Sequence, residues 1–190
     1  MTSGDRRRFV LLTAGVLVAA LFVLDQGTKH WAEANLVELR PEPVVGEILH
    51  FTLLYNSGAA WGLGSGITPV VTLLQIIIAS AVIVLLVRSV RTWSWTVAFA
   101  LIVGGALGNI YDRLLRPPGP FRGEVVDFLQ LPNWPVFNVA DMAVVAGAVL
   151  VVLLGLIGTP MDPADAGGDT EDSADIAHPK PRGTGAEGDR

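Results

Sequence analysis

Four long apolar segments, separated by polar stretches, dominate the pattern of hydrophobic and polar positions along the chain. They run over residues 9–24, 68–87, 93–110 and 139–157. A helix needs about 20 residues to cross the hydrocarbon core of a membrane, and about 17 is the lower limit. The pattern therefore predicts an all-α integral membrane protein with four transmembrane helices, the first of which has to include some flanking residues.

The tryptophans mark the ends of these segments. Trp is enriched at the two interfaces between membrane and water, so it is expected near the ends of spanning helices. Random placement is the alternative, but it would rarely spare every segment centre. None of the five lies at a centre: Trp31, Trp61, Trp93, Trp95 and Trp134.

Residues 44–55, in the first long connection, follow a different pattern. They are rich in β-branched and aromatic residues and are bounded by proline and glycine, which is typical of strands. An isolated hairpin is only marginally stable in water. We therefore expect this segment to be supported by the helices or by the membrane surface.

The connections over residues 25–67 and 111–137 are predicted to lie on the same side of the membrane. Basic residues alone do not decide the orientation, because five fall on each side. The cluster at residues 6–8 precedes the first helix, which usually dominates orientation, so we expect both termini in the cytoplasm and both connections outside. The cluster also imitates a twin-arginine export signal. Because Asp25-Gln26 replaces the small residues of a cleavage site, we expect a retained helix.

The composition agrees with a membrane protein and separates off a tail. The chain is 51% hydrophobic and 16% charged, as integral membrane proteins are. The net charge of −5 comes from residues 162–190, where eight acids stand against three bases. That stretch is rich in Gly, Pro, Ala and Asp and cannot bury enough apolar surface to fold. We predict a transmembrane domain over residues 1–160, a disordered acidic tail over 161–190, and no nucleic-acid partner.

Two aspartates lie close to the start of the last apolar segment. Asp127 precedes this segment, and Asp141 lies near its first residue. A carboxylate at membrane depth costs roughly 2.5–3.5 kcal/mol, so it is a functional candidate by default. Two neighbouring carboxylates do not both ionise easily and can share one proton. Asn138 and Asp141 also have the spacing of a helix N-cap with an acid in the first turn, but capping does not explain Asp127.

Other polar residues gather at the predicted helix ends. Asn109, Asp112 and Arg113 follow a glycine-rich run that favours close helix packing. They could form a helix end with an exposed Asp112–Arg113 charge pair, or a polar cluster that orients the backbone of a substrate. Asp25 and Lys29 have the spacing of a salt bridge that anchors the first helix.

Asn56 and several residue types bear on the class of chemistry. Asn56 could be a turn residue or a donor to a ligand carbonyl. The chain has no cysteine, which excludes thiol chemistry and disulfides. The serine in Gly62-Leu63-Gly64-Ser65-Gly66 lacks the glycine spacing of a serine nucleophile motif, and a Ser–Lys dyad would have to use Lys29. Carboxylates are thus the remaining acid–base candidates. The histidines are scattered, so no metal site is expected: His30, His50 and His178.

Five motifs together resemble lipoprotein signal peptidase, the type II signal peptidase of bacteria. They occur in that family's order, cover roughly residues 9–158, and are far more specific together than any one alone. The stretch from Arg116 to Gly123 is longer and richer in proline than the family usually shows. The motifs are Asp25-Gln26-x-x-Lys29, Asn56-x-Gly58-Ala59-Ala60-Trp61, Gly104-Gly105-Ala106-x-Gly108-Asn109-x-x-Asp112-Arg113, Val125-Val126-Asp127-Phe128 and Phe137-Asn138-x-Ala140-Asp141.

The resemblance implies an aspartic endopeptidase of the bacterial cytoplasmic (inner) membrane that cleaves diacylglyceryl-modified prolipoproteins before the lipidated cysteine. It implies four helices, a small extracytoplasmic β-cradle and a site facing outside, with no cofactor or metal. A monomer in the lipid bilayer is expected. The resemblance makes Asp127 and Asp141 the catalytic pair. The substrate-binding residues would be Asn56, Asn109, Arg113 and Asn138, and the supporting residues Asp25, Lys29 and Asp112.

A non-enzymatic role is the alternative. A small polytopic membrane protein, such as a subunit of a proton-coupled transporter or an assembly factor, could use the acids as a proton relay. Relay carboxylates are expected near the centres of spanning helices, whereas Asp127 and Asp141 are predicted at one interface. Residues 72–87 and 94–108 contain no charged residue, which disfavours a proton path through the membrane.

Overall fold

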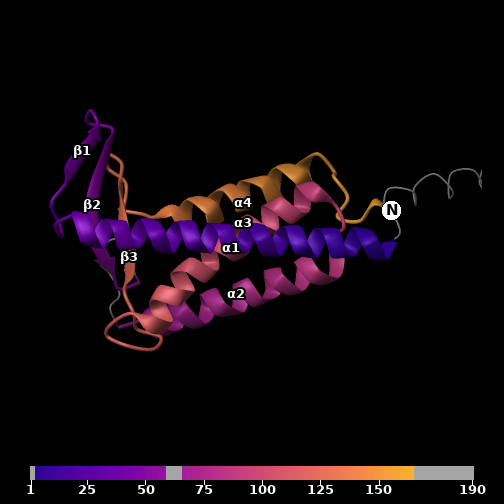
Figure 1. Cartoon of the computed structure of the whole chain (residues 1–190), viewed down its shortest axis with the longest axis horizontal. Coiled ribbons are helices and arrows are strands. Elements are labelled where there is room, and N and C mark those ends of the chain that lie inside the picture. The colour runs from indigo at the N-terminus through magenta and orange to yellow at the C-terminus, as the bar shows by residue number, and fades with distance from the viewer. Residues whose placement is uncertain (1–2, 59–65, 165–190) are drawn as a thin grey trace, which may run out of the picture.

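The computed structural model describes residues 3–58 and 66–164. Four long helices form an elongated bundle, and a small sheet covers one end of it (Figure 1). Each of these four helices is long and apolar enough to cross a membrane, which confirms the predicted fold class. The helices are α1 (Ser3–Asn35), α2 (Thr68–Ser89), α3 (Trp93–Leu115) and α4 (Val139–Leu156).

Two helices run further than the sequence pattern predicted. The connection expected from residue 25 begins as helix, because α1 continues to Asn35, and α3 continues past residue 110 to Leu115. The added turns contain no proline, and several of their polar side chains find partners inside the protein, among them Asp25, Lys29 and Asp112. Ala32 is fully buried under the sheet. The expectation of loops at these positions was wrong because the tertiary structure satisfies the polar residues.

Glycine allows α3 and α4 to pack closely. A Cβ at Gly105 would collide with the backbone oxygen of Ala140, and a Cβ at Gly147 would lie 2.7 Å from the backbone oxygen of Ala98. In lipid the hydrophobic effect does not drive helices together, and small residues at the interface let their backbones pack closely instead. This contact fixes the start of α4 against the middle of α3. α1 also packs along α3, so α3 is the centre of the bundle.

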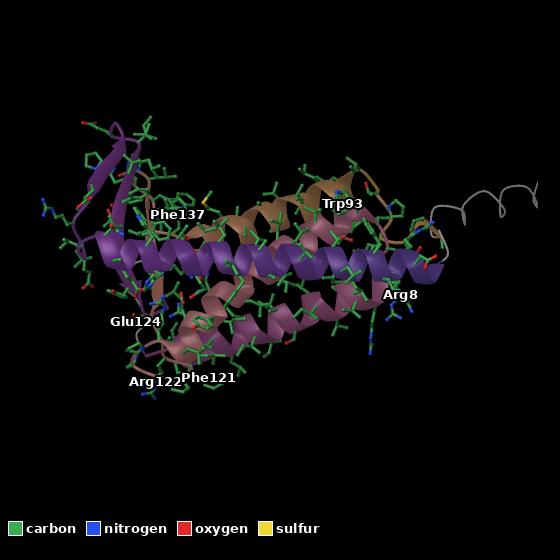
Figure 2. All side chains as sticks on the ribbon, in the orientation of Figure 1. Arg8, Trp93, Phe121, Arg122, Glu124 and Phe137 are labelled. Carbon is green, nitrogen blue, oxygen red and sulfur yellow. The ribbon has the colours of Figure 1, made fainter. Side chains whose placement is uncertain are left out.

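The end of the bundle far from the sheet holds one hydrophobic core. Arg8 and Trp93 lie at this end, whereas Phe121, Arg122 and Glu124 lie at the sheet end (Figure 2). The indole nitrogen of Trp95 donates a hydrogen bond to the backbone oxygen of Thr159 (2.9 Å), which ties the end of α4 to α3. The buried residues of this core are Val10, Ala14, Leu86, Val90, Trp95, Ala98, Phe99, Ala100 and Leu154.

The sheet joins both long connections. Strands β1 (Glu42–Val45) and β2 (Leu49–Asn56) form an antiparallel hairpin, and β3 (Val125–Gln130) pairs with β2. The strand-like pattern at residues 44–55 is therefore confirmed, and the third strand comes from the connection between α3 and α4.

Aromatic contacts attach the sheet to α1. The ring of Trp31 lies 5.1 Å from that of Phe51 and 6.4 Å from that of Phe128, both edge-on. Edge-to-face pairs at such distances are favourable. These contacts provide the support from the helices that an isolated hairpin would lack.

Some sequence predictions fall outside the described residues. These are the position of Trp61, the segment that contains Ser65 (residues 62–65), and the prediction of a disordered tail, as far as it concerns residues 165–190. The described chain ends near the start of α1 (Figure 1), and Met161 packs against the core at that end.

Candidate active site

Asp127 lies on β3 with its side chain almost completely buried. The strand register opposes Asn56 to Val125 and Leu54 to Asp127. Residues two apart on a strand share a face, so the side chains of Asn56 and Asp127 are diagonal neighbours. The amide nitrogen of Asn56 donates a hydrogen bond to Asp127 Oδ2 (2.8 Å).

Asn138 links the two aspartates directly. Its Nδ2 donates to Asp127 Oδ1 (2.6 Å), and its Oδ1 accepts from the backbone N–H of Asp141 (3.0 Å). The backbone N–H of Asn138 donates in return to Asp141 Oδ2 (3.2 Å). This capping box at the start of α4 confirms the predicted N-cap. One asparagine therefore caps the helix and also holds both acids beside each other.

Asn109, on α3, completes the hydrogen bonding of Asp141. Its Nδ2 donates to Asp141 Oδ1 (2.7 Å), and its Oδ1 accepts from Lys29 Nζ (2.9 Å) and from Asn138 Nδ2 (3.2 Å). A lysine ammonium can only donate, so it fixes the Asn109 oxygen as the acceptor. The amide nitrogen is then directed at the Asp141 carboxylate.

Lys29 is fully buried and lies between two buried acids. Its Nζ lies 2.8 Å from Asp25 Oδ2 and 2.7 Å from Asp112 Oδ2. With Asn109 as the third acceptor, all three ammonium hydrogens have partners. Asp25 Oδ1 accepts the backbone N–H of Ala140 (3.0 Å). The predicted Asp25–Lys29 salt bridge is confirmed, and it connects α1, α3 and the start of α4.

Asp112 belongs to this buried cluster. Arg116 Nε lies 2.7 Å from Asp112 Oδ1, and Arg116 Nη1 lies 2.5 Å from Glu33 Oε1. Because Asp112 is fully buried and pairs with Lys29 and Arg116, the alternative of an Asp112–Arg113 pair exposed at a helix end is wrong.

Arg113 holds the connections around the site. Its side chain is 4% exposed, and its Nη1 donates to the backbone oxygens of Asn56 (2.9 Å) and Gly123 (3.2 Å). These bonds fix the end of β2 and the chain leading into β3. Asn56 is also a turn residue, one of the two roles that its sequence position suggested, because its Oδ1 accepts a hydrogen bond from the backbone N–H of Gly58.

Burial and a neighbouring charge raise the pKa of Asp127. The pKa of Asp127 is raised to about 7, chiefly because the carboxylate is buried and also because the charge of Asp141 lies close to it. The hydrogen bonds from Asn56 and Asn138 and the charge of Lys29 lower that pKa, but they do not outweigh burial. A carboxyl with such a pKa can keep a proton near neutral pH, as a general acid requires.

A cleft opens beside the pair between α2, α3 and α4. It has a volume of about 260 Å³, and Asp141 and Asn109 lie in its wall. Val145 and Ile78, which also line it, are 61% and 51% exposed on the bundle surface. The other lining residues are Gln75, Ala79, Ile102, Ala106 and Val144.

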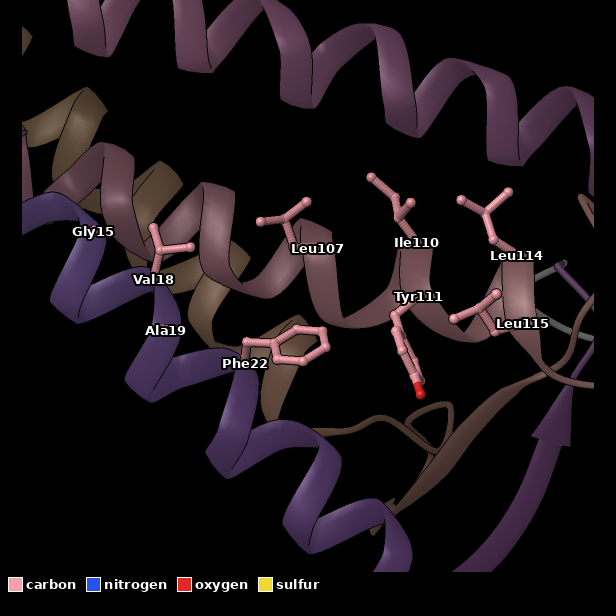
Figure 3. Close-up of a pocket in the computed structure, with 9 residues that line it drawn as sticks. All are labelled: Gly15, Val18, Ala19, Phe22, Leu107, Ile110, Tyr111, Leu114 and Leu115. Atoms are coloured by element: carbon pink, nitrogen blue, oxygen red, sulfur yellow. The ribbon is translucent and has the colours of Figure 1, made fainter.

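A larger groove of about 490 Å³ lies elsewhere, between α1 and α3 (Figure 3). It contains no acid, base or amide side chain, and the tip of Tyr111 is its polar group. It is therefore not the site of acid–base chemistry. Among the described residues, no group of three or more His, Asp or Glu is placed to hold a metal ion.

Sequence reasoning assigned no role to Gln26. Its Nε2 donates to Asp25 Oδ2 (3.1 Å), to the backbone oxygen of Gly108 (3.2 Å) and to Asp112 Oδ1 (3.2 Å). Its position between Asp25 and Lys29, directly after the long apolar stretch of the first helix, was the available signal. The Arg116–Glu33 pair joins segments 83 residues apart, and no local pattern indicates it.

The fold and the site define a class: a membrane-embedded aspartic peptidase. The sequence model of the family described as signal peptidase (SPase) II matches residues 17–157. The chain belongs to that family.

Curated relatives and solved structures agree. A lipoprotein signal peptidase of Mycobacterium avium (strain 104) is 43% identical over 156 residues, which are 82% of this chain and 84% of the relative. One of Streptomyces coelicolor is 41% identical over 164 residues, which are 85% and 77% of the two chains. A solved structure described as a bacterial membrane enzyme has a TM-score of 0.69 at 30% identity and covers 77% of this chain and 89% of its own.

Replacing Asp25 tests the supporting cluster. We expect Asp25→Asn to lower the free energy of unfolding by about 1.5–3 kcal/mol, because a hydrogen bond to a charged group has that magnitude. The loss is no larger because Lys29 keeps its ion pair with Asp112. Thermal unfolding in detergent measures it. Turnover per folded molecule should stay near the wild-type value; a stable variant with lost turnover would place Asp25 in the chemistry.

Proposed function

We propose that this protein removes the signal peptide from diacylglyceryl-modified prolipoproteins by cleaving the peptide bond before the lipidated cysteine. Membership of the signal peptidase II family supports the reaction class. The observation that carries the site assignment is the pair of Asp127 and Asp141, joined by Asn138 at one end of a membrane bundle. No cofactor enters the proposed reaction.

The reaction then uses the two aspartates in different protonation states. Asp141, ionised, takes a proton from a water molecule that attacks the scissile carbonyl carbon. Asp127 keeps a proton because its pKa is raised to about 7, and it gives that proton to the carbonyl oxygen. When the tetrahedral intermediate collapses, the carbon–nitrogen bond breaks and the leaving amine takes a proton from the pair.

The surrounding amides and Arg113 have positioning roles in this proposal. Asn109 and Asn138 direct the carboxylates, and Arg113 holds the strand end that carries Asn56. The side chain of Asn56 is half-buried and lies against Asp127, and its amide can also bind the substrate backbone. The supporting residues bond Asn109 and the start of α4 and do not touch the substrate; they are Asp25, Lys29 and Asp112.

We place the protein in the bacterial cytoplasmic membrane, with both termini in the cytoplasm and the sheet end outside. The arginine cluster of residues 6–8 supports this orientation, and Arg8 lies at the end opposite the sheet (Figure 2). We propose that it acts as a monomer in the lipid bilayer, because one chain supplies the whole site. The cleft between α2 and α4 would receive the apolar part of the substrate.

The alternative, a non-enzymatic proton relay, is less consistent with this arrangement. A relay needs titratable groups distributed across the membrane. The pair instead lies at the sheet end, and the core at the other end is built of apolar side chains. Incubation of purified protein with a lipidated precursor peptide distinguishes the two: release of the signal peptide supports the peptidase, and an intact peptide contradicts it.

The rate of cleavage should depend on pH through Asp127. Its pKa is raised to about 7, so the proton needed for catalysis is present below that pH and lost above it. We expect kcat/KM to fall by nearly tenfold per pH unit above about pH 7. Initial rates measured between about pH 5 and pH 9 in one detergent test this. Constant activity up to the alkaline end would contradict the assignment of the acid.

A further inference from the structure

Gln75 is a polar residue in the membrane-spanning part of α2 that the proposed reaction does not use. Its Oε1 atom is buried and has no hydrogen-bond partner. The amide makes no hydrogen bond to any residue that the structure describes. It lies in the wall of the same cleft as Asp141 and Asn109. The other residues of that wall are apolar.

An amide in this position is unfavourable without a ligand. Burying a polar group without a hydrogen bond destabilises a protein, and lipid offers no substitute partner. Because no residue that the structure describes holds the Gln75 amide, it can rotate about its last bond and turn its oxygen or its N–H groups toward the cleft without losing a hydrogen bond to those residues.

A peptide substrate supplies the missing partners. Under the proposed function, an apolar signal sequence enters the membrane as a helix but has to be extended where it is cleaved, because a peptidase needs access to a free carbonyl. Extension releases backbone N–H and C=O groups from helical hydrogen bonds. At membrane depth each of these groups needs a new partner, and an amide side chain provides both a donor and an acceptor.

We propose that Gln75 is a substrate-binding residue whose carboxamide pairs with the backbone of the extended segment just before the scissile bond. This inference rests on the proposed function. Gln75 and Asp141 line the same cleft of about 260 Å³. An extended chain advances about 3.3 Å per residue, so a chain that lies in this cleft with its scissile bond at Asp141 meets Gln75 within the few residues that precede that bond.

The first test is Gln75→Met, which keeps the length of the side chain and removes the amide. We expect KM for a lipidated precursor peptide to rise about two- to tenfold, the range for one neutral hydrogen bond, with little change in kcat. The melting temperature should not fall, since the amide has no hydrogen-bond partner within residues 3–58 and 66–164. Leu74→Met, on the 55% exposed neighbour, is the matched control and should leave KM unchanged.

The second test uses substrates in which one peptide N–H before the cleavage site is replaced by an ester oxygen. For one position in the series, the wild-type enzyme should lose affinity, and Gln75→Met should show no further loss. Such coupling would identify the N–H that Gln75 binds.

Two outcomes would overturn the inference while leaving the peptidase intact. One is an unchanged KM for Gln75→Met with normal cleavage. The other is a loss of stability in Gln75→Met together with purely additive effects across the ester series, which would make Gln75 a structural residue. Failure of the wild-type protein to cleave any precursor peptide would instead overturn the proposed function, and this inference with it.

Discussion

Asp127→Asn and Asp141→Asn are each expected to reduce kcat/KM for a lipidated precursor peptide by about 1,000-fold or more. General acid–base catalysis by one positioned group contributes about 100- to 10,000-fold, and groups that act as a unit are lost together when either is removed. Asparagine matches the shape of aspartate but cannot exchange a proton. The measurement is the rate of signal-peptide release by purified protein at equal folded concentration.

The controls separate chemistry from folding. Both variants should still accumulate in the membrane as folded protein. A modest fall in melting temperature is expected, because each carboxylate accepts hydrogen bonds on both oxygens and asparagine replaces one of these acceptors by a donor. Glu47→Gln makes the same acid-to-amide change on an exposed residue of the β1–β2 turn and should cleave at the wild-type rate. Near wild-type turnover in either aspartate variant would remove it from the catalytic pair.

Lys29→Met should have the largest effect on stability. Removing one partner of a buried ion pair costs about 3–5 kcal/mol, because the remaining charge is left uncompensated. Lys29 is fully buried between Asp25 and Asp112, and it also fixes the amide of Asn109. Since a domain has only about 5–15 kcal/mol of stability, we expect little folded protein. The folded fraction after detergent extraction measures this.

Neutralising a second member of the cluster should reverse part of that loss. In Lys29→Met with Asp25→Asn, one buried charge disappears while Arg116 still compensates Asp112. We expect the double variant to be more stable than Lys29→Met alone, which a double-mutant cycle detects as coupling. Simple addition of the two losses would show that Lys29 does not act through these charges.

The apolar segments predicted the helices well, but not where α1 and α3 end. A prediction based on composition recognises a spanning helix by its apolar residues and ends that helix at the first polar residue. Asp25, Gln26 and Lys29 are polar, yet their partners come from α3 and from the start of α4. A helix that continues because distant residues satisfy it cannot be recognised from its own sequence.

The site was partly accessible from the sequence. The unusual cost of acids near a membrane indicated Asp127 and Asp141, and motif order supplied their neighbours. The sequence could not show that Asn138 serves both acids, since its capping pattern is a sufficient local explanation. Strand β3 was equally hidden, because the strand it pairs with, β2, lies about 70 to 80 residues earlier in the chain.

The cleft between α2 and α4 determines how the enzyme should be assayed. Its walls reach the outer surface of the bundle through Val145 and Ile78, so under the proposed function a substrate anchored in the same membrane can enter sideways without passing through water. Encounter then depends on how densely precursors populate the bilayer plane. Michaelis constants for this protein should be expressed as mole fraction of lipid, and diluting the substrate with added detergent or phospholipid at fixed total volume should slow the reaction.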